Sequence, residues 1–336
     1  MRAGLTVRLV TPAPPGSRSG NRVTAERWAS MLVRLGCGVT VDVAGEPGAG
    51  AGARGGAGAD ADFLVALHAR RSHAEVVEFA RTGRPIVVGL AGTDVYRDLP
   101  AGDAAALDSI MRADRIVALQ PRAAAALPEA VRARVRVIHQ SCQLPAPMPR
   151  FEPAPGPGRF RVAVVAHLRA IKDPLAAAEA AALLAADSAV EVVHVGDALD
   201  PDLAERARRA GAAPDARYRW LGPVARERAL ALVAGSRLLC LTSLAEGGAN
   251  AITEALACGT PVISSRIEGS LGILGEVYPG LFEPGDRVGL AALLEAAATD
   301  ASFAAELARR CGALAPLADP AAELASWRAL VDEIAP

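Results

Sequence analysis

The sequence predicts an α/β protein made of two doubly wound parallel sheets. Short apolar runs alternate with segments of helical periodicity, a proline-rich stretch at 144–157 interrupts the alternation, and the same alternation starts again after it. Runs that are apolar throughout are typical of parallel strands, because helices cover both faces of such a sheet. With 336 residues the chain is long enough for two such domains, which we place at 1–148 and 149–318.

Six strands are predicted in each half. Those of the first half lie near residues 6–10, 39–43, 63–67, 85–90, 115–119 and 135–138. Those of the second half lie near 161–166, 190–195, 218–221, 238–241, 261–264 and 280–282. The first helix is predicted to begin with Asn21 as its N-cap and to end near Gly36. The glycine- and alanine-rich residues 44–60 predict a surface loop. The apolar spacing within 319–336 predicts a terminal helix that packs back on the first domain.

The composition argues against several classes of function. The net charge of −1 is unlike that of a general nucleic-acid binder. No uncharged apolar stretch approaches the length of a membrane span, and the N-terminal residues resemble a first strand and not a signal peptide, so we expect a cytoplasmic protein. The five scattered cysteines lack the spacing of metal ligands, which predicts reduced thiols and no metal cofactor.

Two glutamates eight positions apart, Glu246 and Glu254, give the most specific functional signal. Gly247 and Gly248 follow the first glutamate and lead into a short predicted helix that contains the second. Amide groups at a helix N-terminus attract anions, whereas carboxylates accept hydrogen bonds from hydroxyls. The segment therefore predicts a ligand that is part phosphate and part polyol, such as a nucleotide sugar.

A pair of cations follows the first strand of the second half. Arg169 and Lys172 lie in the segment 167–174, and Lys172 is the only lysine among 36 basic residues. A lone lysine in an arginine-rich chain indicates a need for a compact, mobile ammonium, although chance survival at a helix start is the alternative. Both cations are suited to neutralise a departing diphosphate. Gly196 and Leu221, after the next two strands, are candidates for the base pocket or simple turns.

The loop after the first strand is rich in small polar and basic residues. It lacks the glycine fingerprint of dinucleotide-binding proteins but ends at a helix N-terminus, and its composition suits a small tetrahedral anion. A polar surface loop is the alternative. Its candidate binding residues are Gly16, Ser17, Arg18, Asn21 and Arg22.

Two further loops of the first half carry candidate residues. The run 68–73 contains His68, Arg70 and Arg71, and a histidine at a strand's carboxyl end can donate to an anion or carry a proton near neutral pH. A solvated helix start is the alternative. Thr93 and Asp94 follow the next strand, where Asp94 either orients a hydroxyl or a basic neighbour, or caps a helix.

The glutamate pair, the preceding cations and the two strand–helix arrays together resemble the retaining GT-B glycosyltransferases of family four. The resemblance covers essentially the whole chain and implies two doubly wound Rossmann-like domains facing an interdomain cleft. Five segments look more closely like the selenosugar synthases of selenoneine biosynthesis: 11–25, 64–73, 92–100, 167–174 and 246–276. Those enzymes join selenophosphate to the sugar of a UDP-sugar, typically UDP-N-acetylglucosamine, and release UDP and phosphate.

The resemblance implies a role for each candidate residue. The catalytic set is His68, Arg169, Lys172 and Glu246. The donor-binding set is Gly247, Gly248, Ala249, Asn250, Glu254, Gly196 and Leu221. The acceptor-binding set is Gly16, Ser17, Arg18, Asn21, Arg22, Arg70, Arg71, Thr93 and Asp94. The resemblance also implies a UDP-sugar co-substrate with no metal, no nucleic-acid or membrane partner, and pathway partners in a selenophosphate synthetase and a selenoneine synthase.

Two positions depart from the family pattern. The arginine-to-lysine spacing is shorter than in many family-four enzymes, so either His167 or Arg169 takes the arginine's place. Ala91 stands where many members have a histidine, which makes His68 the better candidate in the first domain.

Other functions remain open on the sequence alone. The arginines of the first half suit a doubly charged, phosphate-like acceptor, because guanidinium groups bind such oxygens with two parallel hydrogen bonds. A family-four transferase with a hydroxyl acceptor is the alternative enzyme. A non-catalytic nucleotide-sugar binder belongs to a different class, and a dehydrogenase is disfavoured by the missing glycine fingerprint.

Overall fold

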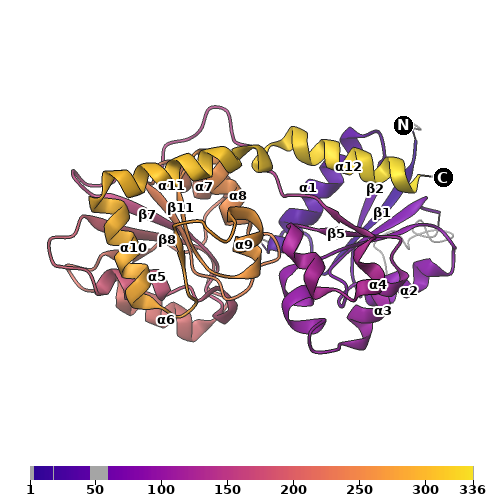
Figure 1. Ribbon diagram of the computed structural model, residues 1–336, viewed down its shortest axis with the longest axis horizontal. Coiled ribbons are helices and arrows are strands. Elements are labelled where there is room, and N and C mark those ends of the chain that lie inside the picture. Colours follow the sequence, from indigo (N-terminus) through magenta and orange to yellow (C-terminus); the bar gives the residue numbers. More distant parts are fainter. Residues whose placement is uncertain (1–3, 18, 46–59, 336) are drawn as a thin grey trace. The chain divides into compact units, whose positions relative to one another are not determined.

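A computed structural model describes residues 4–17, 19–45 and 60–335. The chain divides into two compact units, one made of residues 1–140 with 320–336 and the other of 141–319 (Figure 1). The division falls earlier than the predicted boundary at 148 because of hydrogen bonds near residue 141. The Gln140 side chain donates to Thr24 within the first unit, whereas the Cys142 amide donates to the Ala318 carbonyl within the second.

The first unit contains one parallel sheet of six strands in the order β2-β1-β3-β4-β5-β6. Its elements are β1 (Thr6–Thr11), α1 (Gly20–Arg34), β2 (Gly38–Val43), β3 (Phe63–Leu67), α2 (His73–Ala80), β4 (Ile86–Gly89), η1 (Asp94–Asp98), α3 (Ala104–Arg112), β5 (Arg115–Ala118), η2 (Pro121–Ala126), α4 (Glu129–Arg132), β6 (Val135–Val137) and α12 (Pro320–Ile334). The chain places β2 on one side of β1 and then crosses over to place β3 on the other side, which makes the sheet doubly wound, as predicted. All six predicted strands are present. Most of the predicted loop at 44–60 lies outside the described residues.

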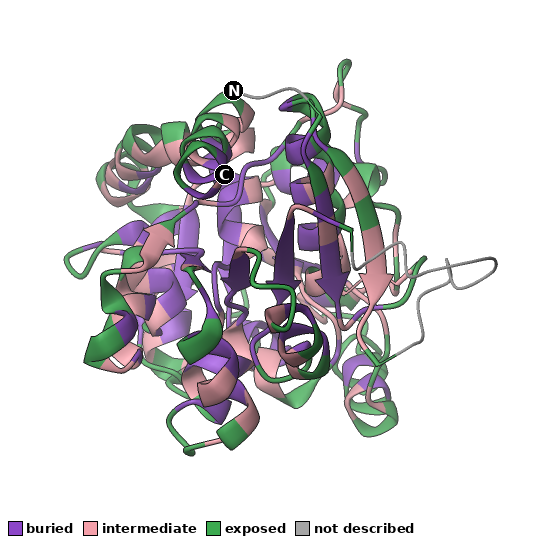
Figure 2. Cartoon of the chain, turned by 90° about the vertical axis from the view of Figure 1, so that its right-hand side faces the viewer, coloured by how far each residue is buried: buried purple, intermediate pink, exposed green. Residues whose placement is uncertain are grey.

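Burial in this sheet follows the apolar runs of the sequence. Every residue of β3 and β4 is buried, whereas the edge strand β2 has no buried residue (Figure 2). Gly89, the last residue of β4, lies directly against the Trp28 ring of α1, so that a Cβ atom at this position would approach the ring to 2.5 Å. The glycine therefore makes room for the largest side chain of the unit's core.

The terminal helix α12 packs on α1 within the first unit (Figure 1). Trp28 and Trp327 meet edge to face, with ring centroids 5.0 Å apart, and both side chains are fully buried. Glu323, also buried, accepts a hydrogen bond from Arg27 of α1 at 3.1 Å. An aromatic edge-to-face contact stabilises by about 1 kcal/mol beyond the area it buries, so α12 is part of the core of this unit.

One predicted boundary in this unit is wrong. Helix α1 begins at Gly20 with Ser19 as its N-cap, and Asn21 lies inside its first turn. The Ser19 hydroxyl accepts the amide hydrogen of Arg22 at 3.4 Å, and the Ser19 carbonyl accepts that of Val23. Serine and asparagine are both good N-cap residues, so the sequence offered two competing starts.

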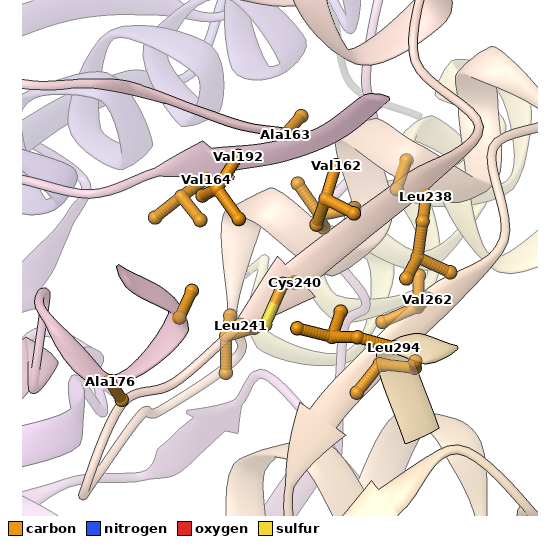
Figure 3. Packing of buried hydrophobic residues seen from close by; sticks show 14 of the residues in the cluster. Val162, Ala163, Val164, Ala176, Val192, Leu238, Cys240, Leu241, Val262 and Leu294 are labelled. Atoms are coloured by element: carbon orange, nitrogen blue, oxygen red, sulfur yellow. The ribbon is translucent and has the colours of Figure 1, made fainter. Parts of the chain in front are cut away.

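The second unit contains a parallel sheet of six strands in the order β12-β11-β10-β7-β8-β9. Its elements are β7 (Phe160–Val165), η3 (Ala170–Lys172), α5 (Ala176–Ala182), β8 (Val190–Val195), α6 (Pro201–Ala210), β9 (Tyr218–Trp220), α7 (Arg226–Ala234), β10 (Leu238–Leu241), α8 (Asn250–Cys258), β11 (Val262–Ser265), α9 (Glu268–Leu274), β12 (Leu281–Phe282), α10 (Arg287–Thr299), α11 (Ala301–Leu314) and η4 (Ala315–Ala318). All six predicted strands are present, and the order again reverses beside β7. The core packs aliphatic side chains of the central strands against helices such as α10 (Figure 3).

All five cysteines are free thiols in the structure. Burial raises the pKa of Cys240 and of Cys258 to about 12, so both are protonated at neutral pH and are weak nucleophiles. Within the described residues, no single helix is both long and apolar enough to cross a membrane. In the same residues, one pair of consecutive helical segments, α10 and residues 301–318, together has the length and composition of a membrane span, but the pair is bent by 99°.

The Gly89→Ala substitution should destabilise the first unit by about 1–3 kcal/mol, because the added methyl group overpacks the core against Trp28. Denaturant unfolding followed by tryptophan fluorescence measures the change. Gly38→Ala is the matched control in the same sheet, since its nearest atom would lie at an ordinary contact distance of 3.7 Å. Equal stability of the two variants would contradict this account of Gly89.

Candidate functional site

Glu246 lies where the loops after three neighbouring strands of the second unit meet. Its carboxylate accepts hydrogen bonds from Lys172 Nζ at 2.5 Å and from Ser243 Oγ at 2.6 Å. Lys172 ends the short turn η3 after β7, and Ser243 follows β10. Gly269 of α9, after β11, touches the Glu246 backbone so closely that a Cβ atom there would collide with its carbonyl oxygen. The structure thus brings together two predicted catalytic residues, Glu246 and Lys172.

Helix α8 begins directly after this loop without a side-chain cap. Its N-cap is Ala249, which is buried, has a positive φ of 28° and makes no side-chain hydrogen bond to the helix. Gly247 and Gly248 precede it and are buried, and Asn250 is the first helical residue. The Ala249 side chain offers no oxygen to the first turn, and the amide hydrogens of Ile252 and Thr253 are accepted by the Ala249 carbonyl instead. A helix N-terminus without a side-chain cap is suited to an anionic ligand.

Glu254 lies in the second turn of α8, as predicted. Its carboxylate forms an ion pair with Arg226 at 3.2 Å, and the same guanidinium nitrogen lies 3.4 Å from the sulfur of Cys142. Glu254 is 14% exposed, so that its carboxylate remains partly accessible to solvent. Arg226 was not predicted, and no local signal points to it because it lies 28 residues before its partner. Ser243 was also missed, although its place after an apolar strand marks it.

The two cations after β7 differ in their surroundings. Lys172 is 25% exposed and paired with Glu246. Arg169 is exposed, and its guanidinium has no ion-pair partner among the described residues. Both follow the carboxyl end of β7, which lies next to β10 in the sheet. The site therefore offers one fixed cation and one exposed cation near a helix N-terminus whose N-cap side chain makes no capping hydrogen bond.

Gly196 and Leu221 serve the packing of the neighbouring strand ends. Gly196 leaves no room for a side chain, because a Cβ atom would collide with the Ala166 carbonyl. Its own amide donates to Gly222, and its carbonyl accepts from Trp220 Nε1. The Leu221 amide donates to the His194 carbonyl. These contacts agree with the alternative of simple turns, and a contact of either residue with a donor stays a prediction.

His194 of β8 is buried and held by two hydrogen bonds. Its Nε2 donates to the Ala166 carbonyl at 2.8 Å, and its Nδ1 accepts from the Tyr218 hydroxyl at 2.7 Å. Burial lowers the pKa of this imidazole to about 4, although the bond to Ala166 opposes the shift. His194 is thus neutral near pH 7 and belongs to the core.

In the first unit, the loop after β1 positions several of the predicted acceptor-binding residues. Gly16 is exposed and has a φ of 77°, and the Ser17 hydroxyl accepts the Ser19 amide hydrogen at 3.2 Å. Asn21 and Arg22 lie in the first turn of α1. Arg22 pairs with Glu26 through Nε at 2.7 Å, whereas its Nη1 is buried with no hydrogen-bond partner among the described residues. Arg18 lies outside the described residues.

His68, Thr93 and Asp94 form a buried hydrogen-bonded group after β3 and β4. The ring Nδ1 of His68 accepts the Arg71 amide hydrogen, so that Nε2 carries the proton and donates to Thr93 Oγ1 at 2.9 Å. Asp94 is fully buried and accepts amide hydrogens from Ala69, Ala91 and Val95. Burial lowers the pKa of His68, while the nearby Asp94 carboxylate opposes this shift.

This group joins the two loops and leaves little for a ligand to contact. His68 has a φ of 78° and is fully buried, as is Asp94. Asp94 is not the N-cap of η1, since Thr93 holds that position and Asp94 is the first residue of the helix. Its carboxylate instead binds amides of the loops after β3 and β4. A direct role of either residue toward an acceptor stays a prediction and requires the loop to open.

The two adjacent arginines after β3 differ in whether they form ion pairs. Arg70 pairs with Asp103 at 3.0 Å and lies 3.7 Å from Asp98. Arg71 is exposed, and its guanidinium has no ion-pair partner among the described residues. Because β1, β3 and β4 are neighbours in the sheet, the loops that carry the predicted acceptor-binding residues lie at one edge. Among the cations of this edge that the structure describes, Arg71 is the one best able to meet an anion.

Comparison with known proteins identifies the architecture. Residues 159–325 match the family described as Glycosyl transferases group 1. Among solved structures, the chain is similar to Anabaena Alr3699/HepE in complex with UDP, at 17% identity and a TM-score of 0.75 over 98% of this chain and 100% of that chain. The chain has the GT-B fold. No curated protein sequence matches it significantly.

Two further GT-B structures resemble the chain over almost their full length. The sucrose-phosphate synthase of Thermosynechococcus elongatus shares 18% identity with a TM-score of 0.72, over 98% of each chain. A glycosyltransferase of Rickettsia africae shares 14% identity with a TM-score of 0.73, again over 98% of each chain. The predicted fold class is confirmed. The absence of a metal cofactor stays a prediction, although the described residues contain no group of three potential His, Cys, Asp or Glu ligands.

Stability should fall in acid because of His194. Its folded-state pKa of about 4 lies below the unfolded value of about 6.5, so the unfolded chain takes up a proton first as the pH falls. The contribution of the neutral ring is complete above about pH 6.5, and about 3 kcal/mol is lost between there and pH 4. Between pH 7 and pH 4, the unfolding free energy of the wild type should fall by this amount more than that of His194→Gln, which lacks the titrating ring. Parallel curves would contradict the assignment.

Proposed function

We propose that the chain is a glycosyltransferase that transfers the sugar of a UDP-sugar to the selenium of selenophosphate. The sugar of the donor is N-acetylglucosamine in this proposal. The match of residues 159–325 to a glycosyltransferase family supports the reaction class. The Anabaena protein is described in complexes with UDP, with UDP and glucose, and with UDP-glucose, which favours a uridine nucleotide as the donor. The acceptor is inferred from the residues of the first unit and from the resemblance of five sequence segments.

The contact between Lys172 and Glu246, in the loops near the N-terminus of α8, carries the donor proposal. Ammonium and helix amides suit a diphosphate, and the adjacent carboxylate suits sugar hydroxyls. We assign Glu246 to the donor sugar and Glu254 to the ribose. Arg169 and Lys172 stabilise the negative charge that develops on the departing UDP, which is an electrostatic contribution to the rate.

The reaction requires little from the acceptor-binding residues of the first unit except binding of an anion. Selenium attacks the anomeric carbon of the sugar, and the bond from that carbon to the UDP oxygen breaks with its electron pair on UDP. Hydrolysis of the phosphorus–selenium bond then releases phosphate and leaves the selenium on the sugar. Selenophosphate is already an anionic nucleophile, so no protein base is needed. The neutral, buried state of His68 agrees with this reaction.

Arginine chemistry favours a phosphate-like acceptor over a neutral one. Arg71 is exposed without an ion-pair partner, and Nη1 of Arg22 has no hydrogen-bond partner, both among the described residues. Guanidinium groups bind phosphate oxygens strongly and with defined geometry. A hydroxyl acceptor that carries its own phosphate group is the alternative that these residues also suit.

Incubation with UDP-N-acetylglucosamine and selenophosphate tests the proposal. UDP release should depend on selenophosphate, and mass spectrometry should find a product that contains selenium and the sugar. The Lys172→Met variant should reduce kcat by about 100-fold or more, because the leaving group loses its cation. Release of UDP with a phosphorylated sugar but not with selenophosphate would favour the hydroxyl-acceptor alternative. Absence of UDP release with either acceptor would refute the transferase.

Replacement of Arg71 should weaken acceptor binding selectively. Arg71→Gln removes one charge-assisted contact, so the KM for selenophosphate should rise by about 10- to 100-fold while the KM for the UDP-sugar stays unchanged. Arg81→Gln removes another exposed arginine of the same unit and serves as the control. An effect of the same size in both variants would mean that only overall charge matters.

A further inference from the structure

Asp173 has an unusual backbone conformation immediately after Lys172. Its φ and ψ angles are 40° and 53°, in the left-handed region, and it ends the turn η3 that contains Lys172. Residues with a side chain adopt this conformation at a cost, and glycine adopts it most readily. A conformation of this kind persists only where the surrounding contacts enforce it. The direction in which Lys172 leaves the turn therefore depends on whatever holds Asp173.

Two backbone hydrogen bonds hold the peptide groups of Asp173, from its amide to the Ala170 carbonyl and from the Ala176 amide to its own carbonyl. Arg287 holds its side chain. The two terminal nitrogens of its guanidinium contact the two carboxylate oxygens of Asp173, each at 2.8 Å. Its remaining nitrogen, Nε, binds Glu179 of α5 at 2.7 Å. Arg287 is the first residue of α10, and 26% of its side chain is exposed. A guanidinium with all three nitrogens engaged fixes both the position and the orientation of the carboxylate it binds.

The other side of Lys172 is tied to the Glu246 loop. The Lys172 carbonyl accepts from Thr242 Oγ1 at 3.0 Å, and the Ile171 carbonyl accepts from the Leu244 amide at 2.9 Å. The Lys172 backbone is thus held on one side by the segment after β10 and on the other by Asp173. Loss of the Arg287 contact would weaken only the second of these constraints, because it leaves Asp173 with its backbone hydrogen bonds alone.

We propose that Arg287 is a positioning residue of the donor site, which acts by holding Asp173 in the left-handed conformation that directs Lys172 to the diphosphate. The inference rests on the proposed binding of a UDP-sugar by Lys172 and its neighbours. Arg287 does not touch the donor in this proposal, and its effect passes through the backbone of Asp173.

A double-mutant experiment separates this role from a general stabilising one. Arg287→Gln should weaken UDP binding, measured by calorimetry, by about tenfold. This loss is expected because the Arg287 contacts would no longer offset the cost of the left-handed backbone at Asp173. Binding of uridine, which has no phosphate, should be unchanged. Arg287→Lys keeps the charge but not the two parallel contacts, and it should show a smaller loss in the same direction. Arg309→Gln, which removes an exposed ion pair with Glu306 on α11, is the matched control.

The Asp173→Gly substitution provides the decisive comparison. Glycine adopts the left-handed conformation without help, so the Asp173→Gly/Arg287→Gln double variant should bind UDP more tightly than Arg287→Gln alone. Normal UDP binding by Arg287→Gln would overturn the inference, as would an equal loss in the Asp173→Gly background or an equal loss of uridine binding. If the wild type does not bind UDP, the proposed donor site itself is refuted, which the wild-type titration shows before any variant is compared.

Discussion

The candidate donor site of the second unit is built around the ion pair between Lys172 and Glu246. The two residues are 74 positions apart in the sequence, and they meet because β7 and β10 lie side by side and point the same way. In a parallel sheet every strand delivers the loop that follows it to the same edge. A compact ammonium and a carboxylate from different loops can then come into direct contact in one small site. The surrounding contacts from Ser243, Thr242 and Gly269 fix that volume further.

The first unit uses the same edge of its sheet in a different way. His68 and Asp94 are turned into the protein, where their hydrogen bonds join the loops after β3 and β4. Arg71 and Gly16 remain exposed on loops of the same edge. Buried polar groups give the loops a defined shape, because an unpaired polar atom in the interior is costly. The polar residues that a sequence places together thus separate into those that build the loop and those that remain accessible.

The sequence predicted the fold well, because most strands are short apolar runs, and central ones such as β3, β4 and β10 are buried throughout. The Glu246–Glu254 segment was also predicted correctly as strand, turn and helix, because glycines mark both ends of the helical part. Side-chain partners that are distant in the chain were not predictable. Arg226 and Arg287 lie 28 and 114 residues from the carboxylates they bind, and only the folded topology makes them neighbours. The left-handed backbone of Asp173 was not predicted either, because aspartate adopts this conformation more often than most residues but still rarely.

The scarcity of lysine has a practical consequence for chemical modification. Reagents that acylate primary amines find a single side-chain target in this protein, and it is partly exposed next to a carboxylate. Every other cationic side chain is a guanidinium or an imidazole, neither of which such reagents acylate stably. One covalent label, apart from the chain's own amino terminus, therefore reports on a single known position beside the glutamate loop.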